Sequence, residues 1–201
     1  MSRTRVLALG YRQWLDVSLY QSLVRAAPGV TALYCPLDVF IDPTAPIVCS
    51  PSSLMLVSAD RVDTWPPAHA LPFSNLQRLY LESLPCDADV WLDDATVALL
   101  TQLTHYGCRT SSDYVWTVDT MVEHLRPIRA LPSLRIILLH SHFFLQSPYT
   151  NLGGWFDEVA ELKDPRIYAS PSSLSLQVWL SIQDDPQSDW WETSGVQVWS
   201  G

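Results

Sequence analysis

The chain has 201 residues, of which 48% are hydrophobic and 16% are charged, so it is long enough for one domain with a sizeable core and too apolar for a disordered tail. Its 12 basic and 21 acidic residues give a net charge of −9, which argues against nucleic acid and anionic membrane surfaces as partners, because both attract basic proteins. No apolar run reaches the roughly 18 residues of a membrane span, and the short apolar stretch near Met1 lacks the features of a signal peptide. We therefore expect an intracellular protein, cytoplasmic or nuclear.

The most informative segment is 75–81, Asn-Leu-Gln-Arg-Leu-Tyr-Leu, which fits the pattern Leu-x-x-Leu-x-Leu. That spacing is typical of the strand of a leucine-rich repeat. Near-copies recur in steps of 23 to 31 residues, and they predict strands at 6–9, 30–35, 54–57, 75–81, 103–108, 134–139 and 166–169. Aligned on the fourth place of the pattern, the seven copies have Leu7, Leu33, Leu56, Leu79, Tyr106, Ile137 and Ile167 in register.

Several of the segments between these strands have a helical period. Asp16 is placed to cap a helix whose apolar face contains Leu19, Tyr20, Leu23 and Val24. A second helix places Val118, Met121, Val122 and Leu125 on one face and is expected to end before Pro127. A third follows Gly153-Gly154 and contains Trp155, Val159 and Leu162, whereas the proline-rich link from residue 60 to 73 predicts irregular backbone.

Helices that connect successive strands with the same repeat pattern indicate a parallel sheet with right-handed crossovers. We predict an α/β leucine-rich-repeat solenoid over residues 1–171, with a sheet of about seven strands and with helices and irregular segments on its convex side. A doubly wound sheet is the main alternative, and a closed barrel also fits a parallel sheet with helical connections. Residues 172–201, rich in tryptophan and acidic side chains, are expected to cap the end of the same domain, and a docking site with tryptophan anchors is the other interpretation.

The segments 73–81, 100–106 and 131–139 resemble the leucine-rich halves of fungal F-box proteins, as do Asp164-Pro165-Arg166-Ile167-Tyr168 and the acidic Asp189-Trp190-Trp191-Glu192. The resemblance implies an open, ribonuclease-inhibitor-like horseshoe that selects targets for a ubiquitin ligase. Members of that family carry the helices of the F-box, which bind the Skp adaptor, ahead of the repeats. Here the first predicted strand begins at Val6, so we expect the recognition half alone, without the Skp adaptor as a partner.

Strand alternation predicts which side chains share the concave face of such a sheet. If the fourth and sixth places point into the core, the third, fifth and seventh point outward. We expect this face to bind a protein target, because tyrosine and arginine often dominate the free energy of binding at protein interfaces. The predicted partner-binding residues are Tyr34, Arg78, Tyr80, Glu82, His105, Arg109, His140, Arg166 and Tyr168. Tyrosines that simply tile an exposed sheet are the alternative interpretation.

Catalytic chemistry has weaker support in the sequence. The two histidines of His140-Ser141-His142, at a strand end, could share a metal ion. The alternative function is therefore a small metal-dependent hydrolase on a doubly wound sheet. A further alternative is a diverged fragment without retained function. Gly153-Gly154 lacks the spacing of a phosphate loop, and no Gly-x-Ser-x-Gly motif occurs. We predict no catalytic residue, metal site or cofactor, and we expect Cys35, Cys49, Cys86 and Cys108 to be thiols.

Overall fold

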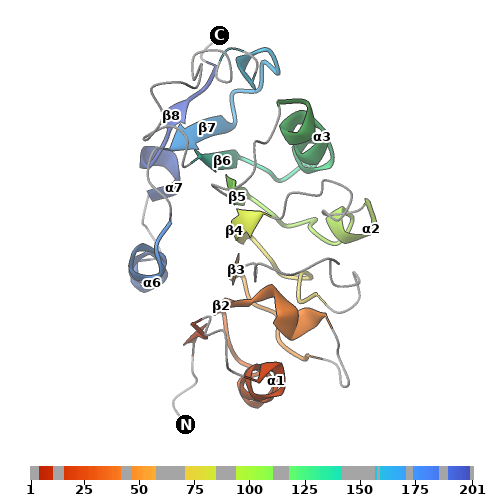
Figure 1. The fold of residues 1–201 in the computed structure, drawn as a ribbon, viewed down its shortest axis with the longest axis vertical. Coiled ribbons are helices and arrows are strands. Elements are labelled where there is room, and N and C mark those ends of the chain that lie inside the picture. The colour runs from red at the N-terminus through yellow and green to blue at the C-terminus, as the bar shows by residue number, and fades with distance from the viewer. Residues whose placement is uncertain are drawn as a thin grey trace.

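The structure of the protein is a computed structural model, which describes residues 5–10, 16–41, 47–57, 71–84, 94–110, 118–141, 157, 159–170, 174–185 and 190–199. Its strands form one open sheet whose spatial order follows the chain, from β1 to β8 (Figure 1). The first seven run parallel and β8 runs antiparallel to β7. The strands are β1 (Val6–Ala8), β2 (Ala32–Pro36), β3 (Ser53–Val57), β4 (Arg78–Leu84), β5 (His105–Thr110), β6 (Ile136–Ser141), β7 (Ile167–Ser170) and β8 (Val196–Gln197).

The helices divide between the two faces of this sheet. Figure 1 shows α1, α2 and α3 on one side of the column of strands and α6 and α7 on the other. The helices are α1 (Val17–Ala26), the 3-10 helix η1 (Leu37–Phe40), α2 (Asp94–Val97), α3 (Val118–Arg129), α6 (Leu176–Asp184) and α7 (Trp190–Thr193). Within the described ranges, no helix has the length and apolar character needed to cross a membrane.

Each strand from β2 to β6 begins with the same hydrogen-bonding arrangement. The backbone carbonyl of the residue just before one strand accepts hydrogen bonds from two consecutive N–H groups at the start of the next strand, at N···O distances of 2.8–3.2 Å. The five accepting carbonyls belong to Arg5, Thr31, Ser52, Gln77 and Thr104. A geometry repeated at five successive steps fixes the stagger between neighbouring strands and aligns equivalent side chains across the sheet.

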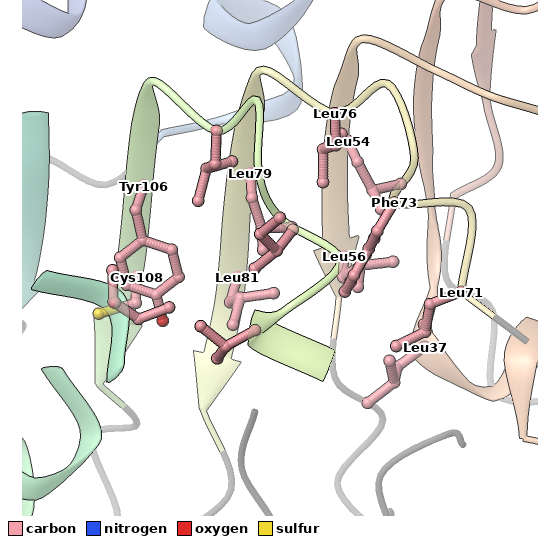
Figure 2. Packing of buried hydrophobic residues seen from close by; sticks show 14 of the residues in the cluster. Leu37, Leu54, Leu56, Leu71, Phe73, Leu76, Leu79, Leu81, Tyr106 and Cys108 are labelled. Atoms are coloured by element: carbon pink, nitrogen blue, oxygen red, sulfur yellow. The ribbon is translucent and has the colours of Figure 1, made fainter. Parts of the chain in front are cut away.

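The side chains on the face toward α1, α2 and α3 form the larger core. One cross-strand row contains Leu7, Leu33, Leu54, Leu79, Tyr106, Ile137 and Ile167. The sequence alignment was wrong at one place, because Leu54 rather than Leu56 pairs with Leu33 and Leu79. This shift of two residues leaves the same side chains facing the core, since strand side chains alternate with a period of two. Figure 2 shows Leu79 and Leu81 beside Tyr106 and Cys108 in this core.

Helix α1 starts as the sequence predicts, but it buries a different face. The Asp16 carboxylate accepts a hydrogen bond from the Ser18 backbone N–H at 2.9 Å. The buried side chains are Tyr20, Gln21 and Val24. Gln21 reaches the core because its amide donates to the Val39 carbonyl at 3.2 Å. Two of the residues predicted for the apolar face point outward, namely Leu19 and Leu23 at 48% and 42% exposure.

Helix α3 continues through the proline that was predicted to stop it. Pro127 lies inside the last turn, and the helix ends at Arg129. Pro127 has no N–H to donate to the carbonyl four residues earlier, so the helix lacks one backbone hydrogen bond there, but burial of Ile128, which is 0% exposed, stabilises the last turn. Met121 and Leu125 are buried as predicted, whereas Val122 is only partly buried.

The C-terminal segment, defined as residues 174–185 and 190–199, covers the second face of the sheet. Strand β8 extends the sheet beyond β7, but α6 and α7 lie against the face opposite α1 (Figure 1). A second core forms there, with Ala32, Tyr34, Met55, Tyr80, Ile136, Leu138, Leu174, Trp179, Ile182 and Trp191. A segment that we predicted to cap the end of the domain, with a tryptophan docking site as the alternative, therefore encloses much of the face that we predicted to be open.

Three of the four cysteines, Cys35, Cys49 and Cys108, are buried free thiols. This agrees with the expectation that these residues are thiols, and burial raises the pKa of the Cys108 thiol to about 12. Other features singled out in the sequence lie outside the described residues, namely Cys86, His142, the Trp65–Pro67 link, Gly153–Gly154 and Trp155.

Candidate recognition surface

The face covered by the C-terminal segment has a central row of side chains that runs across the sheet. Successive pairing places Tyr34, Met55, Tyr80, Gly107, Leu138 and Tyr168 side by side, one from each strand from β2 to β7. A second row contains Ser53, Arg78, His105 and Ile136. Eight of the nine predicted partner-binding residues lie on the strands of this face, and the structure brings them together.

Their exposure divides those eight residues into two groups. Four are buried beneath the C-terminal segment, namely Tyr34, Tyr80, His105 and His140. Four are partly exposed at the border of the covered area, namely Arg78, Glu82, Arg109 and Tyr168. Strand alternation therefore identified the correct face, but it could not reveal that another part of the chain occupies the middle of it.

Tyr80 lies at the centre of the covered area and is only 1% exposed. Its hydroxyl accepts a hydrogen bond from the Leu174 backbone N–H at 3.4 Å. Its ring lies edge-on to the rings of His140 and Trp191, with centroids 5.4 and 6.4 Å away. Burial raises the pKa of the Tyr80 hydroxyl well above its ordinary value, so this group is a neutral hydrogen-bonding phenol at any physiological pH.

Trp191 packs against a strand position that has no side chain. A Cβ atom on Gly107 would lie 2.5 Å from Cδ2 of Tyr80 and 3.0 Å from Cζ3 of Trp191. Both distances are shorter than a carbon–carbon contact allows, so only glycine fits here without displacing a neighbour. We call the surface formed by Gly107, Tyr80 and His105 the Gly107 socket. It receives the indole of Trp191, which is 3% exposed.

A charged contact adjoins this socket. His105 Nε2 lies 3.5 Å from Glu192 Oε1, and the imidazole ring lies 5.5 Å from the ring of Trp191. The Thr104 hydroxyl lies 2.8 Å from the other ring nitrogen, Nδ1. Burial lowers the pKa of His105, and the positive charges of Arg78 and Arg135 act in the same direction, whereas Glu192 opposes them. Glu192 therefore faces a local group of basic side chains in a protein of net charge −9.

His140 is the part of the predicted His-x-His motif that the structure describes. Its ring stacks on Trp190 with centroids 6.2 Å apart and an interplanar angle of 18°. The side chain is 2% exposed, and its surroundings are aromatic. In the described part of the chain, no three His, Cys, Asp or Glu side chains are grouped closely enough to hold a metal ion.

Glu82 and Arg109 form an ion pair between β4 and β5 at the border of the covered area. Glu82 Oε1 lies 3.4 Å from Arg109 Nη1, and both side chains are about one-fifth exposed. Burial raises the pKa of Glu82, while the charge of Arg109 acts to lower it. These two groups are accessible to a partner that contacts the uncovered border of the face.

Arg166 lies in the turn before β7 and makes a structural contact away from the other eight residues. Its guanidinium donates to both carboxylate oxygens of Asp164, at 2.9 and 2.7 Å, and to the Arg129 carbonyl at 3.0 Å. Arg129 also donates to Asp164, at 2.9 Å. Burial acts to raise the pKa of Asp164, but the hydrogen bonds from Arg166 and Arg129 outweigh it and hold that pKa at about 2. Arg166 is thereby tied to α3.

Sequence reasoning missed the contribution of Gly107 and of the tryptophans that face it. A glycine inside a predicted strand indicates a close approach of another group, and that signal was present in the sequence. Tryptophan anchors were only the alternative interpretation of this segment, and its position on this face depends on contacts between residues 87 to 94 positions apart.

Comparison with known proteins gives no identification: no family model matches the chain, no curated protein matches it, and no solved structure matches it.

Proposed function

We propose that the protein is a non-enzymatic protein-recognition module built as a leucine-rich-repeat solenoid. The observation that carries this proposal is the set of five identical strand starts, in which one carbonyl binds two successive N–H groups of the next strand. A solenoid is made of such repeated units, each of which buries its apolar side chains against its neighbours. The parallel strands in chain order support the same conclusion.

The contact surface in this proposal is the face of the sheet that carries the C-terminal segment, together with its uncovered border. Arg78, Glu82, Arg109 and Tyr168 remain partly exposed there. They combine arginine and tyrosine, which dominate binding at many interfaces, with one carboxylate. The resemblance to F-box proteins suggests that the target is a protein selected for a ubiquitin ligase.

Affinity capture with the tagged full chain tests this function, with bound proteins identified by mass spectrometry and scored for targets and for the Skp adaptor. We expect a reproducible target whose recovery falls at least tenfold in the double variant Arg78→Ala and Arg109→Ala. The matched control is Arg126→Ala with Lys163→Ala, which removes the same charge from exposed positions outside this face. Equal recovery by both double variants would count against the proposed surface, and the absence of any reproducible protein would count against the function.

A further inference from the structure

Among the contacts of the C-terminal segment with the sheet, those made by α7 are chemically distinctive. Two adjacent tryptophans lie on α7, with Trp191 in the Gly107 socket and Trp190 stacked on His140. Glu192 follows them and contacts His105. An aromatic pair followed by a carboxylate therefore meets an aromatic surface bordered by basic groups.

The sheet surface at Gly107 leaves room for a side chain from another segment of the chain. The neighbours of Gly107 in its row are Tyr80 and Leu138, both large, so the glycine leaves a depression between bulky groups. The rings of Tyr80 and Trp191 both lie over Gly107, so that one added methyl group would lie 2.5 Å from Cδ2 of Tyr80 and 3.0 Å from Cζ3 of Trp191. The ring that enters here meets the Tyr80 ring edge-on, with centroids 6.4 Å apart, which is an arrangement that aromatic pairs favour.

Charge complementarity adds a second, independent element of selectivity. Arg78 precedes the socket on β4 and pairs in register with His105, and Arg135 directly precedes β6. Both arginines act electrostatically on His105, as Glu192 does. A carboxylate next to the aromatic residue is therefore favoured at this end of the face, and a lysine or arginine there would be repelled.

The first core is formed without the C-terminal segment, apart from Val198 at its border. The residues that contact α6 and α7 belong to the second core on the other face. Release of the C-terminal segment would break the pairing of β8 with β7 and expose the second core, but it would leave the helix-covered core packed.

We infer that the Gly107 socket is a recognition site for an acidic, tryptophan-containing peptide segment, and that the chain's own Trp191 and Glu192 occupy it in the manner of such a partner. The inference rests on the proposed recognition function, whose partner class it names. A target presenting an aromatic side chain followed by a carboxylate competes with the C-terminal segment for this surface. Binding of the target and docking of the segment are then mutually exclusive.

A synthetic peptide of residues 187–199 with a fluorescent label tests this inference, titrated against the full-length protein. We expect it to bind the Trp191→Ala variant, whose socket is vacant, at least tenfold more tightly than the wild-type chain. Adding Gly107→Val to that variant should reduce binding at least tenfold, because the valine side chain fills the socket. A peptide with Trp191→Ala and Glu192→Gln is the matched control and should not bind.

A second form of the protein keeps the test valid if circular dichroism shows that Trp191→Ala does not fold. A protease site placed between Asp185 and Trp190 of the otherwise wild-type chain allows the folded protein to be cut and its own residues 190–199 to be exchanged for labelled peptide. Exchange that is abolished by the control changes in the peptide supports the inference. Failure of the peptide to bind either form overturns it, as does binding that is indifferent to Gly107→Val.

Failure of the inference can be told apart from failure of the proposed function. A target captured equally by the wild-type chain and by Trp191→Ala would show recognition at a different surface and would overturn the inference alone. Specific binding of the peptide without any captured protein would support the inference and leave the proposed function without its target.

Discussion

The two faces of the sheet bury their side chains against very different parts of the chain. On the face toward α1, α2 and α3, the core is filled by residues of the strands and of the segments that directly connect them. On the other face, Tyr80 meets Leu174 and His105 meets Glu192, contacts that join residues 94 and 87 positions apart. The alternation of a strand determines which side chains share a face, but it does not determine what covers that face.

The largest expected effect of a single substitution lies in the first core. Leu79→Ala removes a side chain that is 0% exposed and should lower the free energy of unfolding by about 2–5 kcal/mol. Leu138→Ala, at an equally buried place on the face covered by the C-terminal segment, should lower the free energy of unfolding by less. The reason is that this substitution can cost no more than the free energy with which the segment docks. Urea denaturation measures both, with Leu23→Ala at an exposed position as the control. A larger loss for Leu138→Ala would contradict the distinction between the two faces.

Acid should lower the free energy of unfolding through one buried histidine on the face toward α1, α2 and α3. His124 Nε2 lies 2.5 Å from the Tyr106 hydroxyl, and burial lowers the pKa of His124 from 6.5 to about 4. The unfolded chain therefore binds this proton first as the pH falls, so stability present above about pH 6.5 is lost progressively down to about pH 4. The loss amounts to about 2 kcal/mol between pH 7 and pH 5.

Denaturation curves at several pH values check this expectation in the wild-type chain and in His124→Gln, which cannot titrate. The pH dependence in the variant should be weaker by that amount, whatever its stability at neutral pH. Identical pH profiles would show that His124 has the same pKa in the folded and the unfolded chain and would contradict this expectation.

A smaller effect than that of Leu79→Ala is expected where the C-terminal segment approaches the sheet most closely. Gly107→Ala places a methyl group 2.5 Å from Tyr80 and should cost about 1–3 kcal/mol through overpacking. Gly29→Ala is the control, since nothing lies within 4 Å of the added methyl group. Thermal unfolding compares the two. If both variants melt together with the wild-type chain, Trp191 and Tyr80 do not pack on Gly107 as described.

The repeat pattern predicted many of the core residues on the face toward α1, α2 and α3, because the period of the strands and the spacing between them are local properties of the sequence. The slip between Leu54 and Leu56 was invisible, since both residues are leucines on the same face. The outward position of Leu19 and Leu23 depends on the polar anchors Tyr20 and Gln21, whose hydrogen bonds to backbone carbonyls only the folded chain reveals.

The candidate site was predicted in membership but not in environment. Tyr80, His105 and His140 lie on the predicted face, yet they are buried, because the free energy of covering their rings with Trp190 and Trp191 depends on contacts distant in sequence. Arg166 fell outside the group, since Asp164 two residues earlier offered its guanidinium two carboxylate oxygens.

The central claim is that the C-terminal segment rests on the sheet at Gly107, and nuclear Overhauser spectra of the full-length protein measure this directly. The account predicts cross-peaks from the indole protons of Trp191 to the ring protons of Tyr80 and to the α-protons of Gly107, since the Trp191 and Tyr80 ring centroids lie 6.4 Å apart. A Trp191 indole with the chemical shifts of an unfolded peptide and without cross-peaks to either residue would contradict it.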